Sequence, residues 1–259
     1  MNKDDKMPFT SHLAELRQRI LIILTVLLLV FSLCFTYSDW FVKILIFPIE
    51  KDIKLSLDKP YITFIEKAKE ASLVFLAPAE ALWMNIKVSM VASFVIIIPL
   101  ILMQIWLFVR PALHDKEKNF FFPFIIISTL LFLVGSFFCF AIILPYALGF
   151  LLTYKTSGLT PMLSVGNYMD FTMKFILAFG FVFELPIILI FLTKLGIVTP
   201  EKLTKSRKYA LVLSFVVAAF LTPTPDAFNQ LLMAVPIILL YETGIIASRF
   251  FYRNKKEKE

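Results

Sequence analysis

The chain has very little of what catalytic and metal-binding sites are built from. It contains only two histidines and two cysteines in 259 residues. The sequence motifs of zinc proteases, serine hydrolases, nucleotide-binding P-loops and CxxC redox sites are all absent. Cys34 and Cys139 both lie within apolar runs, where an unpaired cysteine behaves as a small hydrophobic residue. The sequence therefore predicts a protein that is not an enzyme and that uses no metal and no cofactor.

Charged residues are also scarce, because they make up only 17% of the chain, whereas 59% of its residues are hydrophobic and 29 are phenylalanine. A soluble domain of this length does not need so much apolar surface. The composition predicts an all-α polytopic membrane protein. The net charge of +7 is then interpreted as a topology signal, and nucleic acid is not an expected partner.

Six apolar runs predict six transmembrane helices in one transmembrane domain that covers residues 1–259. The fifth run is thirteen residues long and covers about 20 Å as a helix, less than the roughly 30 Å of a hydrocarbon core. The fifth and sixth helices are therefore predicted to be short, with a re-entrant hairpin as the alternative. The predicted spans are residues 20–37, 88–109, 120–152, 171–192, 209–221 and 227–248.

The positions of lysine and arginine predict the orientation of these spans. With the N-terminus inside, most of these residues fall on inner segments, and the outer segments beyond the first outer loop carry only Lys155. This asymmetry predicts that both termini lie on the cytoplasmic side. The first outer loop, residues 38–85, is long and charged. Within it, residues 61–76 are predicted to form an amphipathic helix on the outer surface.

Glu184 lies near the middle of the fourth span, where a charged side chain costs about 2.5–3.5 kcal/mol on insertion scales. Pro186 follows it and cannot donate a hydrogen bond to the carbonyl of Val182, so the helix should open beside the carboxyl group. Gly180, four residues earlier, allows another helix or water to approach. Two interpretations remain open: a protonated glutamate bonded to a neighbouring helix, or a polar site facing a groove where a substrate or partner helix docks.

Polar residues at the ends of the spans offer further candidates. Glu15 precedes Arg19 by four residues, the favourable order for a helix-surface ion pair worth a few tenths of a kcal/mol. Glu117 lies in the first inner loop, which on its own is typical of a solvated loop. At the outer turn, Asp226 either caps the sixth helix through a free backbone N–H or belongs to a docking surface. Gln230, just after the turn, suits an interhelical contact.

Five dispersed motifs together resemble the TatC family, the core subunit of the twin-arginine protein translocase. They are His12-Leu-Ala-Glu-Leu-Arg17, Pro78-Ala-Glu80, Arg110-Pro-Ala-Leu113, Phe183-Glu-Leu-Pro186 and Thr222-Pro-Thr-Pro-Asp226. The resemblance implies six helices curved into a cup in a bacterial-type cytoplasmic membrane. It implies a receptor that binds Arg-Arg signal peptides of folded proteins at its cytoplasmic face. It also implies work with TatA/TatB-type single-span partners, driven by the proton-motive force, and self-association in the receptor complex.

The resemblance also assigns roles to particular residues. Glu15 and Glu117 match the family's signal-peptide site, with Arg17 beside Glu15. Glu184 matches a membrane-buried glutamate on the concave side. Thr222, Asp226 and Gln230 match a region where partner helices dock. The inner loop departs from the family pattern at residues 115–119, and the first outer loop is longer than the family's at residues 51–70. The rival interpretation is a proton-coupled small-solute transporter that uses Glu184 as its relay.

Overall fold

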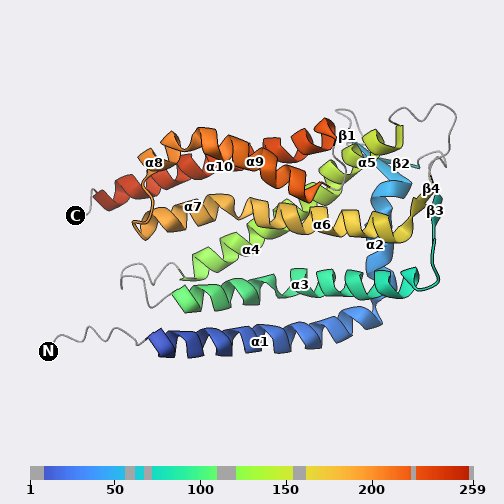
Figure 1. The fold of residues 1–259 in the computed structure, drawn as a ribbon, viewed down its shortest axis with the longest axis horizontal. Helices are drawn as coiled ribbons and strands as arrows, with labels where there is room; N and C mark the ends of the chain where they lie inside the picture. Colours follow the sequence, from blue (N-terminus) through green and yellow to red (C-terminus); the bar gives the residue numbers. More distant parts are fainter. Residues whose placement is uncertain are drawn as a thin grey trace.

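The computed structural model describes residues 9–55, 62–66, 72–109, 121–153, 162–222 and 226–256. Long helices dominate this part of the chain, and short strands lie at one end of the helices (Figure 1). The helices are α1 (Phe9–Thr36), α2 (Ser38–Glu50), α3 (Glu80–Val109), α4 (Phe121–Phe138), the π-helix η3 (Cys139–Ile143), α5 (Leu144–Thr153), α6 (Val165–Phe183), α7 (Leu185–Lys194), α8 (Pro200–Lys205), α9 (Arg207–Leu221) and α10 (Ala227–Lys256). The strands are β1 (Lys51–Leu55), β2 (Ile62–Glu66), β3 (Ser72–Val74) and β4 (Met162–Ser164).

The described residues contain five helical segments long and apolar enough to cross a membrane, so the chain is a multi-pass helical membrane protein. The helix of the fifth run, α9, has only 15 residues, about 22 Å at 1.5 Å per residue, and is short as predicted. The prediction of a short sixth helix is wrong. Helix α10 has 30 residues, because no glycine or proline follows residue 248 to end it.

The predicted amphipathic helix at residues 61–76 is also wrong. Strand β2 lies there instead and pairs antiparallel with β1, with Lys51 opposite Glu66, while β3 pairs in parallel with β4. The run Ile-Thr-Phe-Ile at 62–65 is rich in β-branched and aromatic residues, which fit a strand better than a helix. The apolar residues before β1 form α2, and α3 begins at Glu80, eight residues before the predicted start of the second span.

The long helices lie side by side in an array and run lengthwise between the two ends of the molecule (Figure 1). Helix α1 lies at one edge and packs on α3, α3 packs on α4 and α6, and α10 packs on α7 and α9 at the other edge. Two glycines allow α4 and α6 to approach closely. A Cβ on Gly135 would lie 2.7 Å from the carbonyl oxygen of Phe179, and a Cβ on Gly180 would lie 2.6 Å from the ring of Phe132. The small residue at 180 therefore admits a neighbouring helix, as predicted, and that helix is α4.

The two ends of the array carry different structures (Figure 1). At one end, here called the α8 end, α1 begins, α10 finishes and α8 lies between α7 and α9. At the other, here called the strand end, α2, α5 and the four strands gather. The buried core runs between the two ends and is mainly hydrophobic, with small polar side chains, Gln104, Asn229 and Glu184 buried among the apolar ones. Cys34 and Cys139 are buried and unpaired, as expected for small hydrophobic side chains.

Candidate functional site

A polar cluster joins α1 to α3 near the α8 end. Arg19 donates hydrogen bonds from Nε (3.1 Å) and Nη2 to the same oxygen, Oε1, of Glu15. Its remaining nitrogen, Nη1, donates to Oε1 of Gln104 on α3 at 3.1 Å. The predicted ion pair between Glu15 and Arg19 is therefore confirmed. The role of Gln104 was missed, although a glutamine inside a 30-residue apolar helix is itself a signal of a polar contact.

His12 fixes the same face of α1 onto α3. Its ring stacks on Phe108 with a centroid separation of 4.2 Å and an interplanar angle of 13°. Its Nδ1 lies 3.8 Å from Oε2 of Glu15. The Glu15 side chain is 25% exposed, so a cation arriving from solvent has access to it. Arg17 is exposed on the same helix, and Glu117 lies outside the described residues.

Glu184 occupies a break between two helices in the middle of a membrane-length segment. It ends α6 and precedes α7, with Pro186 in the first turn of α7. Its backbone N–H donates to the carbonyl of Phe181 at 3.1 Å, and its own carbonyl accepts from Ile188 at 3.0 Å. The predicted opening of the helix beside the carboxyl group is therefore present. Its cause is local, because proline has no N–H to continue the ladder.

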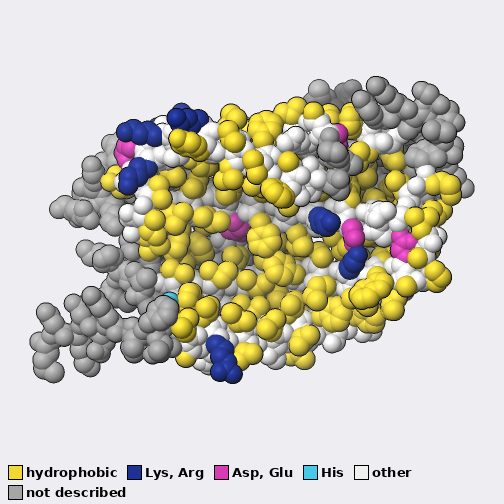
Figure 2. Space-filling model, in the orientation of Figure 1, with side chains coloured by type: hydrophobic (Ala, Val, Ile, Leu, Met, Phe, Trp, Pro, Cys, Tyr) yellow, Lys and Arg dark blue, Asp and Glu magenta, His cyan; other side chains and the backbone are white. Residues whose placement is uncertain are grey.

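The carboxyl group of Glu184 is buried, since the residue is only 7% exposed. Ser128 on α4 lies beside it, but neither Oε1 of Glu184 nor Oγ of Ser128 has a hydrogen-bond partner among the described residues. An unpaired buried polar group costs roughly 1–3 kcal/mol. One face of the array is mostly hydrophobic with isolated charged side chains among its apolar ones (Figure 2). Ser128 lies close enough to act as a partner of the carboxyl group, so a glutamate bonded to a neighbouring helix and a polar docking site are both compatible with this geometry.

The turn between α9 and α10 uses its polar side chains internally. Asp226 accepts a hydrogen bond from the backbone N–H of Asn229 at 2.7 Å through Oδ1, so it caps α10 as one of the two interpretations expected. Nε2 of Gln230 donates to the carbonyl of Phe215 on α9 at 3.1 Å, the predicted interhelical contact. The buried hydroxyl of Thr222 donates to the carbonyl of Ala218 within α9.

The cap and the docking surface can be separated by two substitutions at one position. Asp226→Ala should lower the free energy of unfolding by about 1 kcal/mol, because the first turn of α10 loses its cap. Asp226→Asn should leave it unchanged, because asparagine caps equally well. Thermal unfolding in detergent measures both effects. If binding of a single-span partner is lost in Asp226→Asn at unchanged stability, the carboxylate also serves docking; equal loss of stability in both variants would contradict the capping role.

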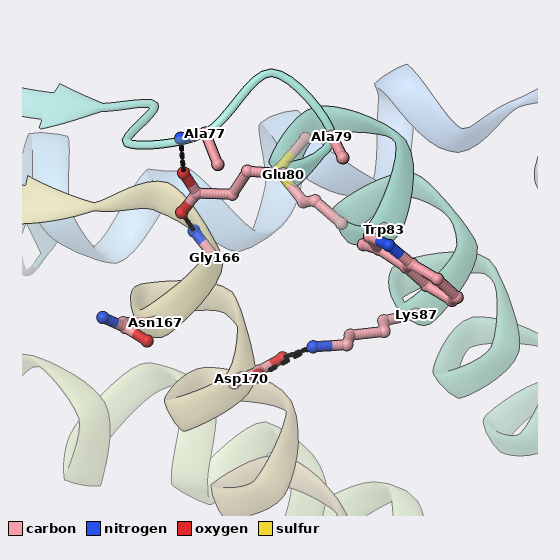
Figure 3. A pocket seen from close by; sticks show the side chains of 9 residues that line it. Ala77, Ala79, Glu80, Trp83, Lys87, Gly166, Asn167 and Asp170 are labelled. Atoms are coloured by element: carbon pink, nitrogen blue, oxygen red, sulfur yellow. Dashed lines mark hydrogen bonds and ion pairs between the residues drawn. The ribbon is translucent and has the colours of Figure 1, made fainter.

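A second polar site, at the strand end, was missed from the sequence. A cavity of about 350 Å³ lies between α3 and α6, and it is lined by Ala77, Ala79, Glu80, Trp83, Met84, Lys87, Gly166, Asn167 and Asp170 (Figure 3). Nζ of Lys87 lies 2.9 Å from both carboxylate oxygens of Asp170. This ion pair links α3 to α6, and both of its side chains remain substantially exposed.

The Glu80 carboxylate beside this cavity is a structural acceptor (Figure 3). It accepts hydrogen bonds from the N–H groups of Leu76 at 2.6 Å and Gly166 at 2.7 Å, and from the hydroxyl of Ser164. It thus ties the turn before α3 to the strand-to-helix junction before α6. Glu80 ends the Pro-Ala-Glu motif, but its partners Ser164 and Gly166 lie 84 and 86 residues away, so the sequence alone did not predict this contact.

These features define a class: a multi-pass membrane protein whose acidic groups lie at one helix end and at a mid-membrane helix break, within an array of long helices. Comparison with known proteins identifies the family. The model of the family described as Sec-independent protein translocase protein (TatC) matches residues 11–236. The chain therefore belongs to the TatC family, as its motifs predicted.

Individual relatives agree with this over almost the whole chain. A Sec-independent protein translocase protein TatC from Aquifex aeolicus is 40% identical over 253 residues, covering 97% of this chain and 98% of the relative. The TatC protein of Escherichia coli strain K12 is 33% identical over 259 residues, covering 100% of this chain and 95% of the relative. A crystal structure of the twin arginine translocase receptor TatC matches with a TM-score of 0.78 and 39% identity, covering 93% of this chain and 99% of that one.

Proposed function

We propose that this chain is the receptor subunit of a Sec-independent translocase in a bacterial-type cytoplasmic membrane. It binds Arg-Arg signal peptides of folded proteins through Glu15 and Glu117 at the α8 end, with Arg17 beside them. The observation that carries the proposal is the partly exposed carboxylate of Glu15, held on the face of α1 that packs on α3 near the α8 end. A carboxylate in this position matches the planar, permanently charged fork of a guanidinium.

The α8 end is the cytoplasmic end in this proposal. Both ends of the described chain lie there (Figure 1), and so do the lysines and arginines of α8, of the start of α9 and of the last two turns of α10. Six crossings, one of them by the short α9, bring the chain back to the side on which it starts. The strand end then faces the other side of the membrane.

In this proposal, recognition takes place at the α8 end, and the later steps of transport take place at Glu184 and at the turn between α9 and α10. Glu184 provides a polar point on the concave face, where the inserted signal peptide or a partner helix settles. Single-span proteins of the TatA/TatB type dock near Thr222, Asp226 and Gln230, beside the short helix α9. The chain self-associates in the receptor complex within membrane lipid, and the proton-motive force drives passage of the folded cargo.

Transport by membrane vesicles tests this proposal directly. Vesicles carrying the full chain with TatA/TatB-type partners should import a folded reporter that has an Arg-Arg signal peptide. A protonophore should stop import, whereas removal of ATP should leave it unchanged. Import that requires ATP, or equal import of a Lys-Lys reporter, contradicts the proposal. Uptake of a small solute by the chain alone, with no import of the reporter, would instead identify the proton-coupled transporter.

A further inference from the structure

The carboxylate proposed to receive a signal-peptide arginine already holds an arginine of its own chain. Arg19 directs two of its nitrogens at Oε1 of Glu15, and His12 lies near Oε2. The Arg19 side chain is only 19% exposed, so this is a partly buried contact rather than a loose surface pair. A guanidinium therefore occupies the Glu15 site before any signal peptide arrives.

Arg19 also has a second acceptor, which does not depend on Glu15. Its Nη1 donates to Oε1 of Gln104, and Gln104 is only 6% exposed within the apolar helix α3. A buried amide without a partner is costly, so the contact with Arg19 also satisfies Gln104. If Arg19 leaves Glu15, it keeps a hydrogen-bond partner on α3, and the exchange costs less than exposure of an unpaired cation.

We propose that Arg19 is an internal ligand of Glu15: it occupies the site of one signal-peptide arginine in the empty receptor and withdraws to Gln104 when the signal peptide binds. This inference rests on the proposed signal-peptide site at Glu15. A bidentate guanidinium uses both oxygens of a carboxylate. Since Arg19 already uses Oε1 twice, the incoming arginine and Arg19 cannot both bind in their preferred geometry.

An internal ligand lowers the affinity of every competitor by the same factor, because the contact that is lost is the same for each. Binding of Arg-Arg and Lys-Lys peptides is weakened by the same factor, and only the Arg-Arg peptide, which binds more tightly, keeps a useful affinity. The empty site is also kept neutral, which avoids leaving a bare carboxylate beside the membrane. Exchange of one guanidinium for another makes the net binding energy small and allows the signal peptide to be released later.

The test is a double-mutant cycle with a fluorescently labelled synthetic Arg-Arg signal peptide, measured by anisotropy on the full chain in nanodiscs. Arg19→Gln should tighten binding about fivefold to tenfold, the size expected when one charge-assisted contact no longer has to be broken. Glu15→Gln should weaken binding more in the Arg19→Gln background than in the original chain. Arg19→Lys keeps the charge but loses the fork, so it should tighten binding to an intermediate degree.

A residue that only positions Glu15 would give the opposite signs. Arg19→Gln would then weaken peptide binding and make Glu15→Gln matter less, and this result would overturn the proposal. Unchanged affinity in Arg19→Gln would also overturn it, because the peptide would then use Oε2 alone. If Arg19→Lys bound the peptide as tightly as the original chain does, the positive charge at position 19 alone would account for the effect. That result would also contradict the proposed exchange of guanidinium groups at Glu15.

Gln104→Met separates the withdrawal step from the binding step. It should weaken peptide binding when Arg19 is present, because the displaced guanidinium is then left with no partner, whereas in the empty receptor it keeps Glu15. It should have no effect in the Arg19→Gln background. Failure of this inference is distinguishable from failure of the proposed function. If Glu15→Gln changes Arg-Arg peptide binding in no background, the signal-peptide site itself is wrong; if it weakens binding but Arg19→Gln does not tighten it, only the internal ligand is wrong.

Discussion

Replacing Glu15 and Glu117 together by glutamine is expected to weaken binding of an Arg-Arg signal peptide about a hundredfold or more. Each carboxylate is proposed to bind one arginine, and a net tenfold loss at each site corresponds to about 1.4 kcal/mol. This is within the range of hydrogen bonds to charged groups. Peptide anisotropy on the full chain in nanodiscs measures the effect, and each single variant should lose about tenfold.

The controls for this prediction are on the same helix and in the peptide. Gln18→Ala changes an exposed residue of α1 and should leave the affinity unchanged. A Lys-Lys peptide should bind the original chain much more weakly, because lysine lacks the planar fork. Glutamine at position 15 keeps a side-chain oxygen that accepts from Arg19, so thermal unfolding should change little. Equal affinity for both peptides in all variants would contradict the assignment of the site.

Glu184→Ala is expected to leave the first binding of the signal peptide intact and to reduce transport about tenfold or more. The reason is position. Glu184 lies ten residues before the end of α7 at the α8 end, about 15 Å along a helix, and on a different helix from Glu15, so it is not expected to take part in the first contact with the peptide. In the proposed mechanism, loss of its carboxyl group removes the polar point where the inserted signal peptide or a partner helix settles, at a step after recognition. Peptide anisotropy and reporter import by vesicles measure the two steps separately.

Stability provides the control for this prediction. Because Oε1 of Glu184 is buried without a partner among the described residues, its removal relieves an unmet hydrogen bond, which offsets part of the cost of truncating a buried side chain. The unfolding temperature should therefore change little. Glu184→Gln keeps a polar group of the same shape, so import should be partly retained if polarity is what the step requires. If Glu184→Ala lost initial peptide binding as fully as the Glu15 and Glu117 variants, the division between recognition and transport would be wrong.

Local chemistry was sufficient to predict part of this structure. Long apolar runs gave the long helices, Pro186 gave the break at Glu184, and Asp226 gave a helix cap, because each depends on residues within one or two helical turns. The errors arose where the signal was weaker or absent. Residues 62–65 are apolar enough to fit a strand or an amphipathic helix, and α10 continues past residue 248 because nothing there ends it.

The contacts that shape the candidate sites could not be predicted from the sequence for a different reason. The hydrogen bond from Arg19 to Gln104 joins residues 85 positions apart, and the pair Lys87 and Asp170 joins residues 83 apart. The two residues of each pair lie on different helices, so helical spacing cannot predict that they meet. Only the packing of α1 on α3, and of α3 on α6, brings them together. The sequence predicted the pair between Glu15 and Arg19, but it did not predict the additional contact of Arg19 with Gln104 on α3.

Site-specific photocrosslinking tests the central claim most directly. A photoreactive residue is placed at Ala14, beside Glu15 at the α8 end, or at Leu76, which is 73% exposed at the strand end. A biotinylated Arg-Arg signal peptide is then added to the cytoplasmic face of membrane vesicles. Crosslinking from position 14, abolished by excess unlabelled Arg-Arg peptide but not by Lys-Lys peptide, is the predicted result. Crosslinking from position 76 with none from position 14 would contradict the account.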